Sequence, residues 1–426
     1  MEYDVVVVGA RPAGAATAML LARAGLKVLA VDRARFPSDT LSTHQIQVPG
    51  SACLARWGVL DKVVASNCPP AMGARFDSGK AVLTGDYPAS DGVRGIYSPR
   101  RTVLDTILVD AARDAGADVL EGFDVDDVVA SDGRVTGIRG TEKGASGQNR
   151  TFTAHLVIGA DGKHSRIARA VGAETYRERP TQSANSYAYW SGLPITGGEI
   201  YLRDRRLIGA WPTNDGLTLT FIEMPIADFK AFHADSVAST HAALDMAANL
   251  GERAHAATLV EHIRATPDLP NVFRKPYGPG WALVGDAGLV MDPITGQGIG
   301  HALRDSQWLS DAVIAGLSGD RPLDEGLAEF QRRRDDASGP MFDFTTDLAS
   351  FRPDPTADIL FGALERKPEH VSDFLGMLTG TYPVKDYFAG RHMGRVVGIR
   401  GTIRVMASQL RGRRMAASEA VGATSS

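Results

Sequence analysis

Cysteine is scarce in this sequence, which contains only Cys53 and Cys68 among its 426 residues. Two cysteines exclude a disulfide framework and a cysteine-rich zinc site, so we expect two reduced thiols in a cytosolic protein. The N-terminus lacks the basic segment and the cleavage site of a secretory signal. No apolar run approaches the roughly 20 residues that a membrane span requires. We therefore expect a cytoplasmic protein with no membrane span.

An excess of positive charge is also missing. Lys and Arg number 46 against 50 Asp and Glu, for a formal net charge of −4. This balance argues against nucleic acid as the main partner, because phosphate binding favours a basic face. His241, His255 and His262 lack the H-E-x-x-H spacing of a metal site, and no G-x-S-x-G nucleophile motif occurs. The length predicts about two to three domains.

The chain opens with a strand–turn–helix–strand pattern. Residues 3–8 are a continuous apolar run, as in a buried parallel strand, residues 15–24 favour a helix, and residues 27–31 favour a second strand. The turn from Gly9 to Gly14 keeps the first and last glycines of the G-x-G-x-x-G dinucleotide fingerprint. Arg11 stands at the middle glycine of that motif.

These residue types suit the binding of a dinucleotide. Gly9 permits the tight turn, and Gly14 permits close packing of the helix on the strand. The helix N-terminus then presents free N–H groups to a pyrophosphate. Asp32 ends the second strand, where an acidic residue accepts hydrogen bonds from ribose hydroxyls. The alternative is a tight turn followed by an incidental aspartate.

Two further motifs follow short buried strands. The segment from Gly159 to Ser165 begins Gly-Ala-Asp-Gly, a common turn sequence that carries little information alone. Gly285-Asp286-Ala287 follows the strand expected at residues 281–284. The glycine-rich loop at 293–300 leads into a helix expected at about 301–315. Such a loop presents backbone N–H groups and a positive dipole end to negative charge.

The rest of the chain divides into segments of distinct pattern. We expect a long helix at 98–116, a hairpin within 123–153 and an antiparallel stretch at 182–225. Residues 228–265 look helical and rich in alanine. Residues 324–412 look mostly helical, with loops near Pro340 and Pro353.

Taken together, the three motifs resemble the class A FAD-dependent monooxygenases, the family of para-hydroxybenzoate hydroxylase. They are also similar to the related geranylgeranyl reductases and flavin-dependent halogenases. The resemblance covers about residues 1–320. It implies a set of FAD-binding residues: Gly9, Arg11, Pro12, Ala13, Gly14, Asp32, Arg33, Arg101, Asp161, Gly162, Gly285, Asp286, Gly298 and Ile299.

The resemblance also implies individual roles. Asp32 binds the adenosine ribose, Arg101 of the pattern R-x-x-L-D reaches the FAD phosphates, and Asp161 lies near the pyrophosphate. Asp286 binds the ribityl or ribose region. The loop beside the flavin ring consists of Pro293, Gly296, Gln297 and Gly298. The family's arginine after the Asp-Gly motif is replaced by Ala168, flanked by Arg166 and Arg169.

The implied fold class is α/β. A Rossmann-type FAD-binding domain carries an inserted mixed antiparallel β-sheet substrate domain and is followed by a helical C-terminal region. We place the FAD-binding domain at 1–75, 96–180 and 275–325 and the substrate domain at 76–95 and 181–274. The helical region covers 326–414, and a flexible tail covers 415–426.

The implied function is an FAD-dependent monooxygenase that hydroxylates or epoxidises a small aromatic or polyketide-like substrate with NAD(P)H and O2 through a C4a-hydroperoxyflavin. No second strand–G-x-G-x-x-G–helix unit occurs, so NAD(P)H would bind transiently as a co-substrate. The alternatives are a reductase of an isoprenoid C=C bond and a flavin-dependent halogenase, whose W-x-W-x-I-P motif is absent. A nucleotide-binding carrier without turnover is a further alternative.

Four residues outside the motifs are candidates for the substrate pocket. His44 and Gln47 follow the first strand–helix–strand unit, in a region that passes close to the flavin ring in the family. Trp190 and Trp211 lie on expected strands and either wall the pocket or pack within the sheet.

Arg11 precedes Pro12, which biases it toward an extended backbone. We therefore predict that its side chain leaves the pyrophosphate and points toward solvent or toward the flavin-side cavity.

Overall fold

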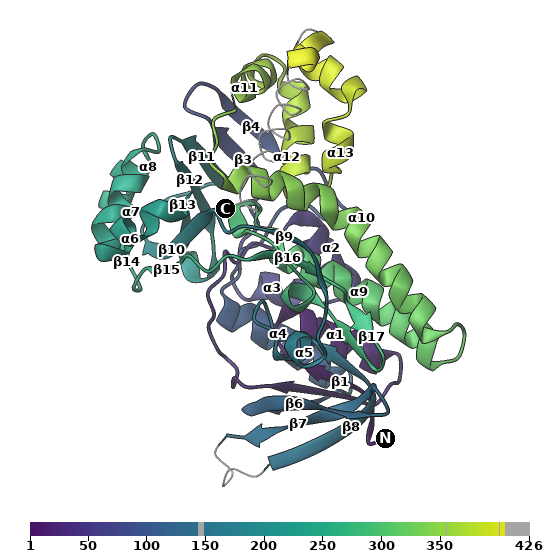
Figure 1. The fold of residues 1–426 in the computed structure, drawn as a ribbon. Coiled ribbons are helices and arrows are strands. Elements are labelled where there is room, and N and C mark those ends of the chain that lie inside the picture. Colours follow the sequence, from purple (N-terminus) through teal and green to yellow (C-terminus); the bar gives the residue numbers. More distant parts are fainter. Residues whose placement is uncertain (144–148, 355, 400, 405–426) are drawn as a thin grey trace, which may run out of the picture.

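The structure is a computed structural model that describes residues 1–143, 149–354, 356–399 and 401–404. Its central sheet is drawn near the bottom of Figure 1. The main path of this sheet consists, in spatial order, of β17 (Tyr277–Gly278), β18 (Trp281–Leu283), β8 (Asn149–Gly159), β1 (Tyr3–Val8), β2 (Val28–Asp32) and β5 (Asp118–Glu121). From β18 to β5 the neighbours are parallel, and β17 pairs antiparallel at the edge.

Both faces of the central sheet are covered, which explains the continuous apolar run of β1. On one face pack α1 (Pro12–Arg23), α4 (Arg101–Asp114) and α9 (Gly298–Leu317). On the other face pack β6 (Phe123–Ser131) and β7 (Arg134–Glu142), which continue from the outer half of β8. The three remaining helices of this part are α2 (Val48–Arg56), α3 (Leu60–Ala65) and α5 (Arg166–Ala170).

A second, mixed sheet stands beside the first (Figure 1). Its spatial order is β14 (Thr258–Leu259), β10 (Ser183–Ser191), β13 (Thr218–Pro225), β12 (Arg206–Pro212), β11 (Gly198–Arg203), β3 (Gly73–Asp77) and β4 (Val82–Asp86), with β15 (Arg264–Thr266) also on β10. All its pairs are antiparallel except β11 with β3. The predicted α/β fold with a mostly antiparallel sheet domain is confirmed.

One face of the second sheet carries α6 (Phe229–Ala234), α7 (Ser236–Asp245) and α8 (Leu250–His255). The prediction that residues 228–265 are helical throughout is therefore wrong at its end. Thr258–Leu259 and Arg264–Thr266 pair as short strands with β10. Tertiary pairing overrides the helical composition of this segment.

A small sheet joins the two larger ones. It consists of β9 (Thr175–Arg179), β16 (Asn271–Arg274) and β19 (Leu289–Val290), with β16 in the middle. Short 3-10 helices mark the turns around it and elsewhere: η1 (Asn214–Gly216), η2 (Ile226–Asp228), η3 (Gly285–Ala287), η4 (Pro293–Thr295) and η5 (Pro368–His370).

The C-terminal region begins with α10 (Leu323–Ala349), which runs past both sheets in Figure 1. The predicted loop near Pro340 is wrong, because Pro340 lies inside α10. Proline costs a helix one backbone hydrogen bond, and the buried Met341 and Phe342 keep this turn packed on the core. The helices that follow include α11 (Ala357–Arg366), α12 (Val371–Thr379) and α13 (Val384–Tyr387), and residues 390–399 are also helical.

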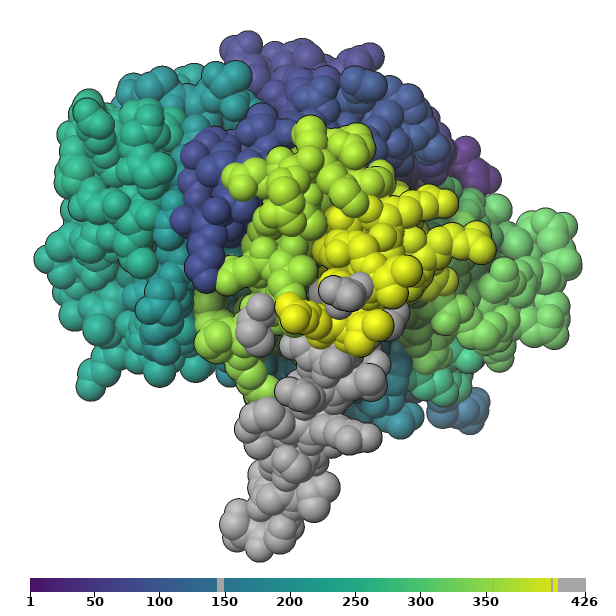
Figure 2. All heavy atoms as spheres, turned by 90° about the horizontal axis from the view of Figure 1, so that it is seen from above, coloured from purple at the N-terminus to yellow at the C-terminus, as the bar shows by residue number. Residues whose placement is uncertain are grey.

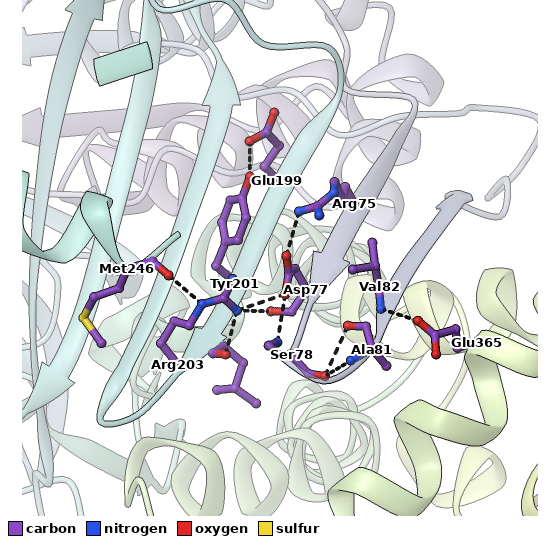
Figure 3. Close-up of polar contacts among 12 residues, drawn as sticks. Arg75, Asp77, Ser78, Ala81, Val82, Glu199, Tyr201, Arg203, Met246 and Glu365 are labelled. Carbon is purple, nitrogen blue, oxygen red and sulfur yellow. Dashed lines mark hydrogen bonds and ion pairs between the residues drawn. The ribbon is translucent and has the colours of Figure 1, made fainter. Parts of the chain in front are cut away.

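The helices after α10 are attached to the outer strands of the second sheet. Figure 2 shows α11 in contact with the segment around β3 and β4. The Val82 N–H donates to Glu365 of α11 at 3.0 Å, as drawn in Figure 3. The same figure shows Arg203 donating to the carboxylate and the backbone carbonyl of Asp77, which Arg75 also pairs. These hydrogen bonds connect β11 to β3 next to the C-terminal helices.

The domain division remains a prediction. The strand β3 begins at Gly73, three residues before the boundary that we placed at 76. The predicted tail at 415–426 lies outside the described residues.

Candidate functional site

The turn between β1 and α1 admits no side chain at its two glycines. Gly9 has φ +100°, and a Cβ there would lie 2.4 Å from the Ala160 carbonyl oxygen. A Cβ on Gly14 would lie 1.7 Å from the Gly9 carbonyl oxygen. Pro12 begins α1, whose first turn contains no acidic residue and whose N-cap makes no side-chain hydrogen bond. The first N–H groups of α1 are therefore available to an anion.

Asp32 holds this turn from the end of β2. Its carboxylate accepts from the Ala10 N–H at 2.7 Å and from the Ala34 N–H at 2.8 Å. A carboxylate has about four acceptor positions, so two remain for a ribose diol. Arg33 follows with an exposed side chain.

The three predicted motifs meet at one edge of the central sheet. Val8 pairs with Gly159, and Gly159 pairs with Leu283, so the three strands end in register. A Cβ on Gly285 would lie 2.7 Å from the Cβ of Ala13, which places the third motif against α1. Ligands of open α/β sheets bind at this carboxyl edge.

The two motif aspartates have different surroundings. Asp161 accepts from the Ser165 hydroxyl at 2.5 Å and from the Arg166 N–H at 2.6 Å, so it caps α5. The carboxylate of Asp286 has no hydrogen-bond partner among the described residues. Burial raises the pKa of Asp286, while Arg101, Lys163 and Arg274 act against that rise. Asp286 is thus the aspartate with unused bonding capacity.

Arg274 of β16 links these two motifs, and our sequence analysis missed it. It donates to the Ala287 carbonyl at 2.9 Å and to the Lys163 carbonyl at 3.1 Å. No local pattern marks this residue, because both partners are carbonyls of distant segments.

Arg101 begins α4 and donates to Asp105 through Nε at 2.9 Å and Nη2 at 3.1 Å. Arg11 donates to the same carboxylate at 2.5 Å. The backbone of Arg11 is extended, with φ −84° and ψ −169°, as we predicted. Its side chain, however, does not point to solvent, because Asp105 and the Ser38 hydroxyl hold it. Two arginines on one carboxylate leave a net positive charge beside the turn.

The two arginines that flank Ala168 both make hydrogen bonds to neighbouring segments. Arg166 donates to Asp124 at 2.8 Å and to the Val125 carbonyl at 2.9 Å. Arg169 donates to the His164 carbonyl at 3.1 Å.

The glycine-rich loop before α9 is fixed by neighbouring side chains on one side and is exposed at Gly298 on the other. Gly296 has φ +64°, and a Cβ there would lie 2.2 Å from Gln45 Oε1. The Gln297 amide donates to the carbonyls of Thr295 and Leu378 at 3.0 and 2.8 Å. Gly298 is exposed, and a Cβ there would meet no atom within 4 Å. The first N–H groups of α9, at Gly298 and Ile299, have no partner within the helix, and Gly298 is exposed.

A cleft of about 2250 Å³ opens beside this loop. Pro293, Thr295 and Gln47 line it at the loop, and Trp211 and Phe221 line it from the second sheet. Side chains of α10, α11 and α12 close the far side. Gln47 donates to the Thr295 carbonyl at 3.1 Å, and its buried Oε1 has no partner in the described part of the chain. Two of the four predicted pocket residues, Gln47 and Trp211, are therefore brought together.

Trp190 lies on the opposite face of the second sheet, so its predicted pocket role is wrong. Its ring contacts His241 of α7 with centroids 5.3 Å apart, and its N–H donates to Thr220 at 2.8 Å. Trp190 therefore packs within the sheet, which was the alternative to a pocket role.

His44 does not line the cleft but is fully buried against β10. Its Nε2 lies 2.6 Å from the Tyr189 hydroxyl, and its ring contacts Tyr187 edge-on. The Nδ1 atom of His44 and the hydroxyl of Tyr187 have no partner in the ranges that the structure covers. Burial and the nearby Arg101 lower the pKa of His44 to about 3, so its imidazole is neutral.

No helix among the described residues is long and apolar enough to cross a membrane. Within the same residues, no group of three His, Cys, Asp or Glu side chains is arranged to hold a metal ion.

Comparison with known proteins gives matches along most of the chain. Residues 2–345 match the family model described as FAD binding domain. Digeranylgeranylglycerophospholipid reductase of Methanothrix thermoacetophila is 26% identical over 392 residues, which cover 89% of this chain and 95% of that protein.

Two solved structures illustrate the shared fold. The myxobacterial chondrochloren halogenase CndH has a TM-score of 0.74 at 21% identity, covering 95% of this chain and 97% of that one. A probable FAD-dependent monooxygenase from Pseudomonas aeruginosa has a TM-score of 0.68 at 19% identity, covering 87% of this chain and 99% of that one.

Proposed function

Because this chain belongs to the FAD binding domain family, we propose that it is a monooxygenase that uses its FAD, NAD(P)H and O2 to hydroxylate or epoxidise a small aromatic or polyketide-like substrate. The family assignment itself makes the protein an FAD-dependent oxidoreductase. The choice of a monooxygenase is the proposal.

The observation that carries the proposal is the cleft beside the glycine-rich loop. Its walls include the aromatic side chains of Trp211, Phe221, Phe76 and Phe374. Such walls pack well against a planar or fused-ring substrate and exclude water from it. Exclusion of water matters for oxygen transfer, because reactive intermediates hydrolyse when water is present.

In this proposal each motif has a task. The turn at Gly9 and the N-terminus of α1 bind the pyrophosphate, Asp32 binds the adenosine ribose, and the positive cluster around Arg101 faces the phosphates. Asp286 accepts from the hydroxyls of the ribityl chain. The free N–H groups at Gly298 stabilise negative charge on the ring.

FAD itself supplies the redox chemistry when bound. The residues of this chain orient the ring against the cleft and keep water out. The absence of a side-chain nucleophile motif agrees with chemistry that belongs to the cofactor.

The second candidate function is reduction of an isoprenoid C=C bond. The observation that favours it is the alignment with the archaeal reductase, which covers 95% of that protein. The aromatic and aliphatic side chains in the cleft walls also suit a prenyl chain. A halogenase is less well supported, because the W-x-W-x-I-P sequence is absent.

The test is turnover by the purified protein. NADH or NADPH oxidation is followed with and without O2, against a panel of aromatic, polyketide-like and prenylated compounds, and products are identified by mass. The proposal expects oxidation that needs both O2 and substrate and a product that has gained oxygen. A product that has gained two hydrogens without O2 supports the reductase, and a product formed only with halide supports the halogenase.

A further inference from the structure

Two carboxyl groups are buried together behind the glycine-rich loop, where the proposed mechanism does not use them. Glu223 of β13 and Asp292, just before η4, are both 0% exposed. Neither carboxyl group pairs with an Arg, Lys or His side chain in the part of the chain that is described. Buried carboxyl groups without a cation are rare, because desolvation of the charge is costly.

Asp292 is fixed by three hydrogen bonds. One carboxylate oxygen accepts from the Ile294 N–H at 3.0 Å, and the other accepts from the Ser183 hydroxyl. The Asp292 N–H donates to Asn271 Oδ1 at 2.7 Å. These bonds tie Asp292 to β10, to β16 and to the loop that continues to Gly296.

Glu223 has no such set of donors. It lies within reach of Ser183 and Asp292, but the hydroxyl hydrogen of Ser183 is already donated to Asp292. With both groups ionised, the oxygens of Glu223 have no donor. A proton on Glu223 resolves this, because its O–H can then donate to Asp292.

The protonation of the pair agrees with this geometry. Burial and the neighbouring Asp292 raise the pKa of Glu223 well above its usual range. Burial raises the pKa of Asp292 to about 6. Near neutral pH the pair therefore holds one proton and one negative charge, as coupled carboxyl groups do.

The groups that face the pair from neighbouring elements are neutral. The strand β10 contributes Ser183 and Asn185, β16 contributes Asn271, and β12 places Leu207 opposite Glu223. The helix α10 faces the loop with Thr345, which is hydrogen-bonded to Thr295. The charged Arg177 and Asp343 pair with each other. Among the described residues that surround the pair, no unpaired charged group competes with it for a proton.

We propose that the Glu223–Asp292 pair takes up a second proton from solvent when the flavin is reduced. The inference rests on the proposed position of the ring at the Pro293–Gly298 loop. Gln182 and Pro293, each adjacent in sequence to a member of the cluster, line the cleft.

Hydride transfer from NAD(P)H brings two electrons and one proton, so the reduced ring carries one more negative charge than the oxidised ring. Repulsion by this charge favours the protonated pair. The pair changes from one negative charge to neutral, and the added proton comes from water.

The test is the number of protons taken up per two electrons above about pH 7. The FAD-loaded protein is reduced with dithionite in the absence of substrate and O2, and its midpoint potential is measured against pH. The inference expects a slope that approaches two protons per two electrons in the wild type. It expects one in Glu223→Gln, since the amide donates to Asp292 and keeps it ionised.

The matched control is Asp305→Asn, which removes a buried carboxylate that is paired with Arg304. The control keeps the wild-type slope. A wild-type slope of one proton, or an unchanged slope in Glu223→Gln, overturns the inference. If Glu223→Gln does not fold, Asp292→Asn takes its place, and we expect one proton per two electrons in that variant too, because no negative charge is left to be protonated. Because the titration uses neither substrate nor O2, its outcome does not depend on whether the protein is a monooxygenase.

Discussion

The guanidinium of Arg11 lies 2.5 Å from the carboxylate of Asp105, 94 residues further along the chain. Asp105 is fully buried and also pairs with Arg101. The extended backbone at Arg11 carries its side chain out of the turn, so an arginine is tolerated where the fingerprint has glycine. The substitution therefore adds a positive charge next to the arginine that we expect at the FAD phosphates.

This relationship predicts the effect of Arg11→Gly. We expect about fivefold weaker FAD binding, equal to about 1 kcal/mol, because Arg101 then neutralises Asp105 alone and offers less charge to the phosphates. FAD titration of the apoprotein, followed by flavin fluorescence, measures the change. Arg56→Gly, which removes an exposed arginine paired with Asp91, serves as control and leaves the affinity unchanged. An unchanged FAD affinity in Arg11→Gly would contradict this role of Arg11 at the phosphates.

The two motif aspartates give a second prediction. Asp286→Ala weakens FAD binding about tenfold to a hundredfold, the effect of losing a charge-assisted hydrogen bond worth roughly 1.5–3 kcal/mol. Asp161→Ala affects FAD binding less and lowers the melting temperature more, because Asp161 caps α5. Both are measured by FAD titration and thermal unfolding, and equal or reversed losses of affinity contradict the assignment.

Trp190 and Trp211 show how much of the pocket could be predicted from the sequence. Tyr187 and Tyr189 share one face of β10, and the alternation of a strand puts Trp190 on the other face. The same alternation places Trp211 on the face of Leu207, which lines the cleft. The sequence contained this parity, but which face meets the FAD-binding part depends on packing against α7, far along the chain.

The motif positions were predictable because each depends on local backbone geometry. A positive φ at Gly9 and a strand end at Asp32 are encoded within a few residues. The residues that complete the site are not encoded by such short local sequences. Asp105, Arg274 and Glu223 act through contacts with segments that only the fold brings close. Pro340 was misread because a buried helix can absorb one lost hydrogen bond.

The opposite faces of the second sheet supply a third prediction. Trp211→Phe lowers kcat/KM about threefold to tenfold, since it removes part of an aromatic wall worth roughly 0.5–1.5 kcal/mol. Trp190→Phe makes the same chemical change on the other face. It lowers the free energy of unfolding by about 1 kcal/mol through the lost bond to Thr220, and it leaves kcat/KM unchanged. Equal effects of the two variants on kcat/KM would place the substrate elsewhere.

Tyr189 and Tyr187 form a further matched pair. Tyr189→Phe leaves Nε2 of the buried His44 unpaired and lowers the free energy of unfolding by about 1–3 kcal/mol. Tyr187→Phe removes a buried hydroxyl that has no partner in the described residues, so stability stays the same or rises. Denaturant unfolding of both variants decides the point, and a larger loss in Tyr187→Phe contradicts it.

His44 also predicts the direction of a pH effect. Its pKa is lowered to about 3 in the folded protein, against about 6.5 in the unfolded chain. The unfolded state therefore binds the proton first, and stability falls as pH falls from about 6.5 toward 3. In His44→Gln this part of the fall is absent. Unfolding free energies measured across this range in both proteins show whether the wild-type curve is the steeper one.

The most direct measurement of the proposed function is a single turnover with isotopically labelled O2. The FAD-loaded protein is reduced by NADPH or NADH without air, mixed with an accepted substrate, and then exposed to labelled O2. We expect one labelled oxygen atom in the product, with the other released as water. A product without label, or a product formed before O2 is added, would contradict the assignment as a monooxygenase.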